Sequence, residues 1–259
     1  MDYLKNYYEN YDEDSRLLSR RGQLEYLTTM GYIQAYLKPG MQILEIGAGT
    51  GRYSLALAAM GYEVTAVELI QHNLDILKSK ITPDMKLTPL EGNAMDLEML
   101  DTDSFDITLL LGPMYHLFED AHKRQALSEA IRVTKPGGVV FAAYCITEGT
   151  MIRYAFGRNT IMDLIGRNLL DLKTFDWRSD PSELFALVRK SDIDKLMEGF
   201  PTQRLHYVAT DGLSYFMGDT VDQMDENTFK LFLTYHLTIC ENPDLVGATA
   251  HALDIFRLT

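Results

Sequence analysis

A glycine-rich turn is the first place in the chain where residue types and spacing point to ligand binding. Residues 43–54 read ILEIGAGTGRYS, so a short apolar, β-favouring segment runs into three glycines and then into the helix-like segment 55–60. Such a turn can require glycine because the backbone can take a positive φ and because a missing Cβ lets a ligand lie against the main chain. The pattern predicts a strand, a ligand-binding turn and a helix.

The spacing of these glycines argues against a dinucleotide as the ligand. The dinucleotide fingerprint G-x-G-x-x-G uses its third glycine for close packing of helix on strand beside a pyrophosphate. Here the glycines are Gly47, Gly49 and Gly51. Arg52 stands where that third glycine would fall, and Glu45 places a carboxylate ahead of the turn, where it suits a phosphate poorly. A turn that only connects strand to helix is the alternative.

Two polar side chains follow the next two strand-like segments. Glu68 ends the β-branched segment 62–68, and a carboxylate at a strand tip can accept hydrogen bonds from both hydroxyls of a ribose. Asn93 lies in the stretch EGNAMDL after segment 86–90, and its carbonyl oxygen can accept from an exocyclic amine. For Glu68, a solvated acid at the end of a strand is the alternative.

An acidic residue followed by G-x-G-x-G resembles the first motif of the class I S-adenosylmethionine (SAM) dependent methyltransferases. The resemblance covers about residues 41–145: Glu68 matches the family's ribose-binding acid, Asn93 replaces its adenine-binding Asp, and a KPGG turn begins at Lys135. The family's cofactor brings an amino acid and a sulfonium cation, beside which a carboxylate fits. The resemblance therefore implies SAM as the cofactor. It assigns the cofactor site to Glu45, Gly47, Ala48, Gly49, Gly51, Glu68, Leu69, Asn93, Ala94 and Leu111.

The candidate catalytic residues are Tyr115 and His116. Their stretch, GPMYHL at 112–117, lies where the resembling family carries its fourth motif, beside the methyl group. Amino-directed nucleic-acid methyltransferases have Asn or Asp first in that motif, whereas this chain has Gly112. Histidine can take a proton at neutral pH, and tyrosine can orient a substrate or offer its ring to a sulfonium. A base is optional for methyl transfer, so a buried structural role is the alternative for His116.

Substrate contacts are expected from an inserted lid and from the N-terminus. Residues 147–200 exceed one crossover helix, and we expect them to cover the C-terminal edge of the sheet, where open α/β sheets bind ligands. At least one of Arg153, Arg158 and Arg178 is expected to pair with an anionic substrate group, although pairing with surface acids is the alternative. Tyr11 is expected to contact the substrate as well, because N-terminal helices of the resembling family often form one wall of the substrate pocket. A surface helix whose tyrosines pack on the domain is the alternative.

These elements predict an α/β fold, and the resemblance implies a Rossmann-like class I methyltransferase sheet, mostly parallel and seven-stranded, with an antiparallel C-terminal edge. We expect one domain over residues 1–259, divided into an N-terminal helical cap (1–40), a SAM-binding core (41–146), the lid (147–200) and the sheet edge (201–259). Apolar spacing predicts one helix over 12–37. Ser191 is expected to cap a lid helix, and His236 and His251 are expected to be core histidines.

Composition narrows the class of substrate. The 259 residues carry a formal net charge of −13, whereas a nucleic-acid binder needs a basic footprint. Cys145 and Cys240 lie outside any C-x-x-C pattern and the histidines are scattered, so neither a disulfide framework nor a metal site is expected. No apolar run is long enough to cross a membrane and no signal-peptide pattern is present, so a cytoplasmic location is expected.

The leading prediction is a SAM-dependent methyltransferase that acts on a nitrogen, oxygen or sulfur atom of a small-molecule substrate. Nucleic acid is disfavoured as a partner, and the oligomeric state is left open. An RNA or protein methyltransferase and a SAM-binding module without methyl transfer are the alternatives.

Overall fold

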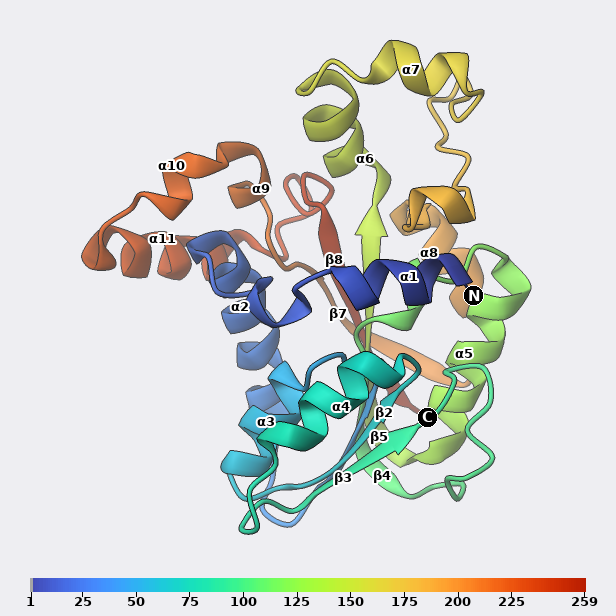
Figure 1. The fold of residues 1–259 in the computed structure, drawn as a ribbon, viewed down its shortest axis with the longest axis vertical. Helices are drawn as coiled ribbons and strands as arrows, with labels where there is room; N and C mark the ends of the chain where they lie inside the picture. The colour runs from blue at the N-terminus through green and yellow to red at the C-terminus, as the bar shows by residue number, and fades with distance from the viewer. Residues whose placement is uncertain (1) are drawn as a thin grey trace.

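A single mixed sheet forms the centre of the computed structural model, which describes residues 2–259 (Figure 1). The strands lie in the order β3-β2-β1-β4-β5-β8-β7. Their bounds are β1 Gln42–Ile46, β2 Glu63–Glu68, β3 Leu87–Glu91, β4 Phe105–Leu110, β5 Thr134–Ile146, β7 Thr202–Ala209 and β8 His251–Leu258. Strands β1 to β5 pair in parallel, whereas β8 runs antiparallel to both β5 and β7. The short β6 (Leu187–Val188) pairs with the end of β5.

The predicted α/β fold class is therefore confirmed, with one detail added. The antiparallel strand is β8, which lies between β5 and β7, and β7 forms the edge. Both faces of the sheet are covered. Apolar side chains of α2 (Arg20–Tyr36), α3 (Arg52–Ala59) and α4 (Gln71–Lys80) pack on one face, and those of α5 (Asp120–Val133) and α8 (Lys190–Met197) pack on the other. This explains why β4 is an almost continuous apolar run.

The order of the strands reverses at β1, which has β2 on one side and β4 on the other. At such a switch point the chain leaves the two strands in opposite directions, which opens a crevice at their carboxyl ends. The turn after β1 and the turn after β4 meet closely there. Gly47 has a φ of +77°, and a Cβ added to it would lie 2.5 Å from Cδ of Pro113. Only glycine fits at this position.

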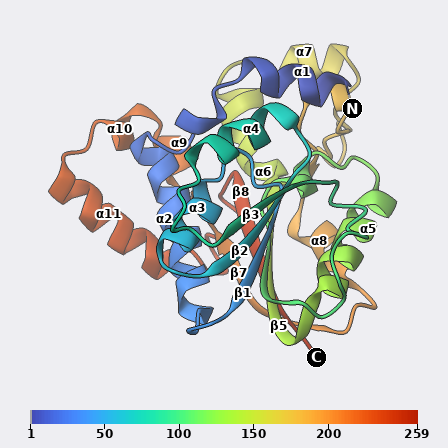
Figure 2. The same ribbon diagram turned by 60° about the horizontal axis from the view of Figure 1, so that its bottom comes forward.

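The N-terminal cap differs from the expected single helix over 12–37, which is wrong over its first residues. α1 (Asp2–Asn10) is a separate helix, a 3-10 turn follows at Glu13–Ser15, and α2 begins only at Arg20. The Asp12 carboxylate accepts a hydrogen bond from the Ser15 N–H, and the Ser19 hydroxyl accepts one from the Gly22 N–H, both at 3.2 Å. These caps break the helix, and α1 instead lies beside α4 at the crevice end of the sheet (Figure 2).

The lid and the C-terminal segments surround the same end of the sheet. After β5 come α6 (Thr147–Thr150), a π-helical stretch Met151–Phe156 and α7 (Ile161–Gly166), which project from the core (Figure 1). α8 begins at Lys190, and its first turn is capped by the Asp192 carboxylate, which accepts from the Arg189 N–H, so the expected cap at Ser191 is wrong. Along the chain, β7 and β8 are separated by the helices α9 (Ser214–Met217), α10 (Asp219–Asp222) and α11 (Glu226–Ile239).

No helix within residues 2–259 is both long and apolar enough to cross a membrane.

Candidate active site

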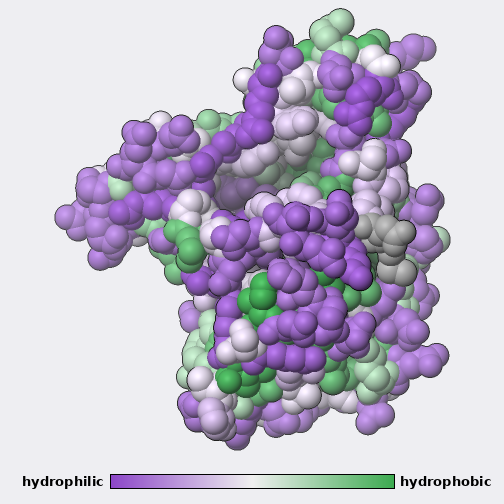
Figure 3. Space-filling model, in the orientation of Figure 1, coloured by the Kyte–Doolittle hydropathy of each residue, from purple (hydrophilic) through white to green (hydrophobic). Residues whose placement is uncertain are grey.

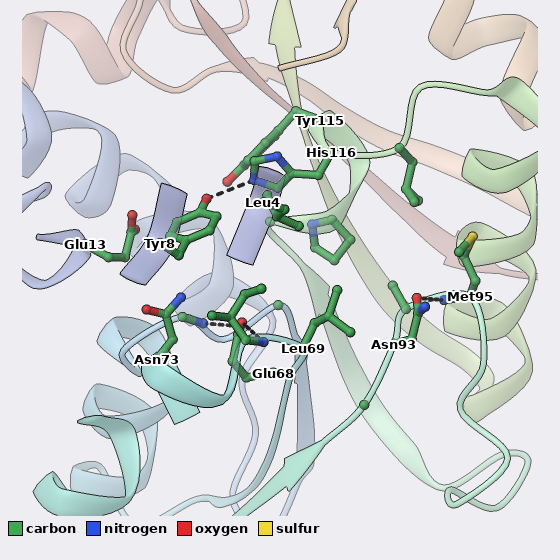
Figure 4. A pocket seen from close by; sticks show the side chains of 18 of the residues that line it. Leu4, Tyr8, Glu13, Glu68, Leu69, Asn73, Asn93, Met95, Tyr115 and His116 are labelled. Carbon is green, nitrogen blue, oxygen red and sulfur yellow. Dashed lines mark hydrogen bonds between the residues drawn. The ribbon is translucent and has the colours of Figure 1, made fainter. Parts of the chain in front are cut away.

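Two neighbouring cavities occupy the switch point. The first, called here the crevice cavity, runs from the glycine turn to the loop after β3 (Figure 4). Its lining includes the predicted cofactor residues Gly47, Gly49, Glu68, Leu69, Asn93 and Ala94. The second, the turn cavity, lies on the other side of the glycine turn and is lined by Glu45, Ala48 and Leu111 among others. Gly51 lines neither, because its φ of +89° and the close approach of the Leu77 side chain give it a packing role.

Glu68 holds the crevice cavity in shape. Its Oε2 accepts from the Gly49 N–H at 2.7 Å, and its Oε1 accepts from the Ile70 N–H at 2.8 Å. Burial raises the pKa of this carboxyl, while the two N–H groups favour the ionised form. Each carboxylate oxygen keeps a further lone pair for a ligand hydroxyl.

Asn73 is a second polar group in the crevice cavity, and the sequence did not single it out. Its side chain is buried on α4, and its Oδ1 has no hydrogen-bond partner among the described residues. A buried carbonyl oxygen without a donor is costly, so this atom is suited to accept from a ligand. On the opposite wall, Asn93 Oδ1 accepts from the Met95 N–H at 3.0 Å, which shapes the loop after β3. Its contact with adenine remains a prediction.

Glu45 lies behind the turn, at the turn cavity. Its buried Oε2 accepts from the Ser54 N–H at 2.9 Å and from the Ser54 hydroxyl. Burial raises the pKa of Glu45 to about 8. A cation brought by a ligand would favour the ionised form of this carboxyl, as the resemblance implies for the amino-acid end of the cofactor.

A third cavity, the aromatic cavity, has a volume of about 650 Å³. It lies between α1, the lid, α9 and the start of β8, and Figure 3 shows the surface hollowed below the projecting lid. Its rings come from Tyr7, Tyr8, Tyr11, Tyr115, Tyr154, Trp177, Phe185 and Tyr215. Tyr11 therefore lines this cavity, and its contact with a substrate stays a prediction. Tyr8, Glu13 and Tyr115 line both the crevice cavity and the aromatic cavity, so they form the boundary between the two.

His116 contacts the boundary between the two cavities through a hydrogen bond with Tyr8 (Figure 4). Its Nδ1 lies 3.1 Å from the carbonyl oxygen of Leu184, and its Nε2 lies 2.9 Å from the Tyr8 hydroxyl. A carbonyl only accepts, so Nδ1 carries the hydrogen and Nε2 of the neutral ring accepts from Tyr8. Burial lowers the pKa of His116 to about 4, which keeps the ring neutral at pH 7. The Tyr115 hydroxyl donates instead to the carbonyl of Leu111 at 2.9 Å.

Tyr8 was not among the predicted site residues, although the spacing of its neighbours indicates its position. Leu4, Tyr8 and Tyr11 recur at intervals of four and three, which places them on one face of a helix. Leu4 is buried, and the two tyrosines line the aromatic cavity. The expected helix began too late in the chain to include this face.

The three lid arginines do not line the aromatic cavity, which corrects the expectation that one of them faces it. Arg153 donates to the carbonyl of Tyr215 and stacks on that ring, 4.6 Å from its centroid. Arg158 lies over the Tyr154 ring, and Arg178 donates to Asn168 at 2.8 Å. The three arginines therefore contact residues of the lid or of the cavity wall without lining the cavity themselves.

Arg16 and His251 are the cationic residues that do line the aromatic cavity. Arg16 Nε donates to Glu13 at 3.0 Å, and its Nη1 donates to both oxygens of Glu25 at 3.2 and 3.1 Å. Arg16 also lines the turn cavity, where it could meet a ligand carboxylate. Nothing in the local sequence marks Arg16, because its position depends on the break between α1 and α2.

The sheet order and the crevice at its switch point define a Rossmann-like, ligand-binding α/β domain. A family model described as a methyltransferase domain matches residues 43–138. The demethylmenaquinone methyltransferase of Lysinibacillus sphaericus is 28% identical over 213 residues, which cover 79% of this chain and 87% of that enzyme. These similarities support a class I SAM-dependent methyltransferase with SAM as its cofactor.

Other similarities are partial or concern the fold alone. A demethylmenaquinone methyltransferase of Clavibacter sepedonicus is 35% identical, but the match spans 38% of this chain and only 39% of that enzyme. A ubiquinone biosynthesis O-methyltransferase of Hahella chejuensis is 25% identical over 60% of this chain and 64% of its own length. Among solved structures, a SAM-dependent methyltransferase of Thermotoga maritima, described as a possible histamine N-methyltransferase, aligns with a TM-score of 0.59 at 18% identity, covering 100% of this chain and 99% of its own.

Replacement of Glu68 by Ala should weaken SAM binding about thirtyfold, or by about 2 kcal/mol, because it removes a charged acceptor and frees the Gly49 and Ile70 N–H groups. Titration calorimetry with SAM measures this change. Glu63→Ala is the matched control, since Glu63 is an exposed acid at the other end of β2. An unchanged affinity in a folded Glu68→Ala variant would place the ribose contact elsewhere.

Replacement of His116 by Gln should make the free energy of unfolding less dependent on pH below neutrality. The pKa of His116 is about 4 in the folded chain and near 6.5 when unfolded, so between these values only the unfolded chain binds the proton and stability falls as the pH falls. Between pH 7.5 and pH 5, His116→Gln should lose about 2 kcal/mol less unfolding free energy than the wild type. Urea unfolding at both pH values measures the difference.

The exposed His122 on α5 gives the control, and His122→Gln should keep the wild-type dependence. Equal pH dependence in His116→Gln and the wild type would show that His116 titrates normally.

Proposed function

We propose that this protein transfers a methyl group from SAM to a nitrogen, oxygen or sulfur atom of a small molecule bound in the aromatic cavity. The observation that carries the proposal is the shared boundary. Tyr8, Glu13 and Tyr115 line both the crevice cavity and the aromatic cavity, so ligands in the two cavities meet across these side chains. A volume of about 650 Å³ suits a small organic molecule.

The residues at the crevice fit SAM. The glycine turn leaves room where a Cβ would lie, Glu68 and Asn73 offer acceptors for ribose hydroxyls, and Arg16 at the turn cavity suits the carboxylate of the amino-acid end. SAM supplies an electrophilic methyl group on a sulfonium. The Tyr8 and Tyr115 rings and the Glu13 carboxylate lie at the boundary, and they would favour a cation that bound beside them. Alignment of the acceptor atom by these walls can supply about 7–11 kcal/mol of the barrier reduction.

Tyr8 and His116 can take the proton from an O–H or N–H acceptor. The Tyr8 oxygen accepts this proton while its own O–H proton passes to Nε2 of His116, to which it is already hydrogen-bonded at 2.9 Å. The low pKa of His116 keeps Nε2 unprotonated at neutral pH, and it also makes the ring a weak base. His116 itself does not line the aromatic cavity, so it would act through Tyr8.

A test of the proposed function is to incubate the protein with methyl-labelled SAM and separated metabolite, RNA and protein fractions of a cell extract. Label should enter the metabolite fraction with release of S-adenosylhomocysteine. Label confined to RNA or protein would favour a macromolecular substrate instead. Binding of SAM without release of S-adenosylhomocysteine from any fraction would indicate a SAM-binding module.

Replacement of Tyr8 by Phe should lower kcat for an O–H or N–H acceptor by about a hundredfold, because the proton loses its first acceptor. His116→Gln should give a similar loss, and the double variant should be little worse than either single one, since the two groups act as a unit. The measurement is kcat at saturating SAM with the labelled acceptor.

Tyr36→Phe is the matched control. Its hydroxyl lies 2.8 Å from His206 Nε2, a similar pair away from these cavities, and its loss should leave kcat unchanged. A Tyr8→Phe enzyme with full kcat would remove Tyr8 from the chemistry and leave alignment as the source of catalysis.

A further inference from the structure

We propose that the acceptor is a planar aromatic molecule bearing an anionic oxygen, and that His251 binds this oxygen. This inference rests on the proposed function, because it names the substrate class for the aromatic cavity. It assigns a binding role to a histidine that the sequence placed in the core.

His251 is the first residue of β8 and lines the aromatic cavity. Its Nδ1 lies 2.9 Å from Oδ2 of Asp211 and 3.8 Å from Oε2 of Glu25. All polar contacts of the ring with the described residues are made by Nδ1, which leaves Nε2 for the cavity. The side chain is 30% exposed, which is consistent with one edge of the ring facing the hollow.

Asp211 fixes both the orientation and the charge of this ring. Its Oδ1 accepts from the Thr249 hydroxyl and from the backbone N–H groups of Ala250 at 3.0 Å and His251 at 3.1 Å, while its Oδ2 receives the imidazole N–H. Asp211 is buried and does not line the cavity. Although burial favours a neutral ring, the carboxylates of Glu25 and Asp211 raise the pKa of His251 well above its usual value. The cavity therefore faces an imidazolium N–H donor.

The acids near this cavity are already engaged. Glu13 and Glu25 accept from Arg16, and Glu183 accepts from Arg167. Four hydroxyls on the wall have no hydrogen bond to any described residue, those of Tyr7, Tyr11, Tyr154 and Tyr215. The other hydroxyls on the wall are engaged within the protein, those of Tyr8, Tyr115, Thr150 and Ser182. Each of the four free hydroxyls can donate a hydrogen bond to a ligand, and the imidazolium N–H of His251 is a cationic donor. A ligand that satisfies them presents oxygen lone pairs.

The walls also select the shape of the ligand. Tyr7 and Tyr11 are stacked with their centroids 4.9 Å apart, and Tyr154 and Trp177 are tilted at 6.5 Å. Flat rings on several sides favour a planar ligand that can make stacked or edge contacts. The π-helical stretch Met151–Phe156, which carries Tyr154, is an irregularity that recurs at functional sites.

Trp177 provides the readout, because it is the single tryptophan of the chain and it lines the cavity. Its fluorescence is titrated in the presence of S-adenosylhomocysteine with 3,4-dihydroxybenzoate, with the corresponding benzamide and with the corresponding benzylamine. The carboxylate should bind at least tenfold more tightly than the neutral amide, and the amine should bind most weakly. Preference for the amide or the amine, or no binding of any of the three, would overturn the proposal.

His251→Gln should reduce the preference for carboxylate over amide to within about twofold, while the variant should still bind SAM in calorimetry. His122→Gln, on exposed α5, should keep the full preference. A His251→Gln variant that folds, binds SAM and keeps the preference would also overturn the proposal, and the wild-type comparison stands if the variant does not fold. If the wild-type protein does not bind SAM, or if no label enters metabolites, the proposed function itself would be overturned.

Discussion

The close approach of Gly47 to Pro113 is the constraint on which the rest of the site depends. It joins the turn after β1 to the turn after β4, with no space for a side chain between them. Gly47 therefore lines the crevice cavity beside the stretch that carries Tyr115 and His116. A side chain at position 47 would push the stretch that carries Tyr115 and His116 away from the glycine turn. The switch point of the sheet makes the crevice, and this contact sets its width.

Most of the fold and the cofactor half of the site could be predicted from the sequence, because both depend on local signals. Strand and helix periodicity, the glycine spacing and Glu68 at a strand tip all lie in segments whose structure is set by neighbouring residues. Glu45, Ala48 and Leu111 line the turn cavity, and their contact with the cofactor stays a prediction. Gly51 is the exception in that turn, since its constraint is the side chain of Leu77, which the spacing does not reveal.

The acceptor half could be predicted much less well, because it is assembled from distant segments. Tyr8 reaches His116 only because Asp12 and Ser19 cap separate turns and let α1 lie across the crevice. His251 faces the cavity because Asp211, forty residues earlier, orients its ring. The prediction for the lid arginines was wrong, because Arg153 donates to the carbonyl oxygen of Tyr215 and does not line the cavity. Charge and residue type alone do not distinguish a residue that lines a cavity from one that supports it.

A chain of ion pairs links the two halves of the site. Glu13, Arg16, Glu25, His251 and Asp211 follow one another through contacts of 2.9 to 3.8 Å. Arg16 lies at the turn cavity and the aromatic cavity at once, and it shares Glu25 with His251. In a partly buried site, charges at these distances interact more strongly than they do in water. A ligand carboxylate that draws Arg16 away from Glu25 would leave that carboxylate to His251 and strengthen the imidazolium charge. Occupation of the cofactor site is thereby expected to prepare the acceptor site for an anionic oxygen, since the two ligands act on the same carboxylate.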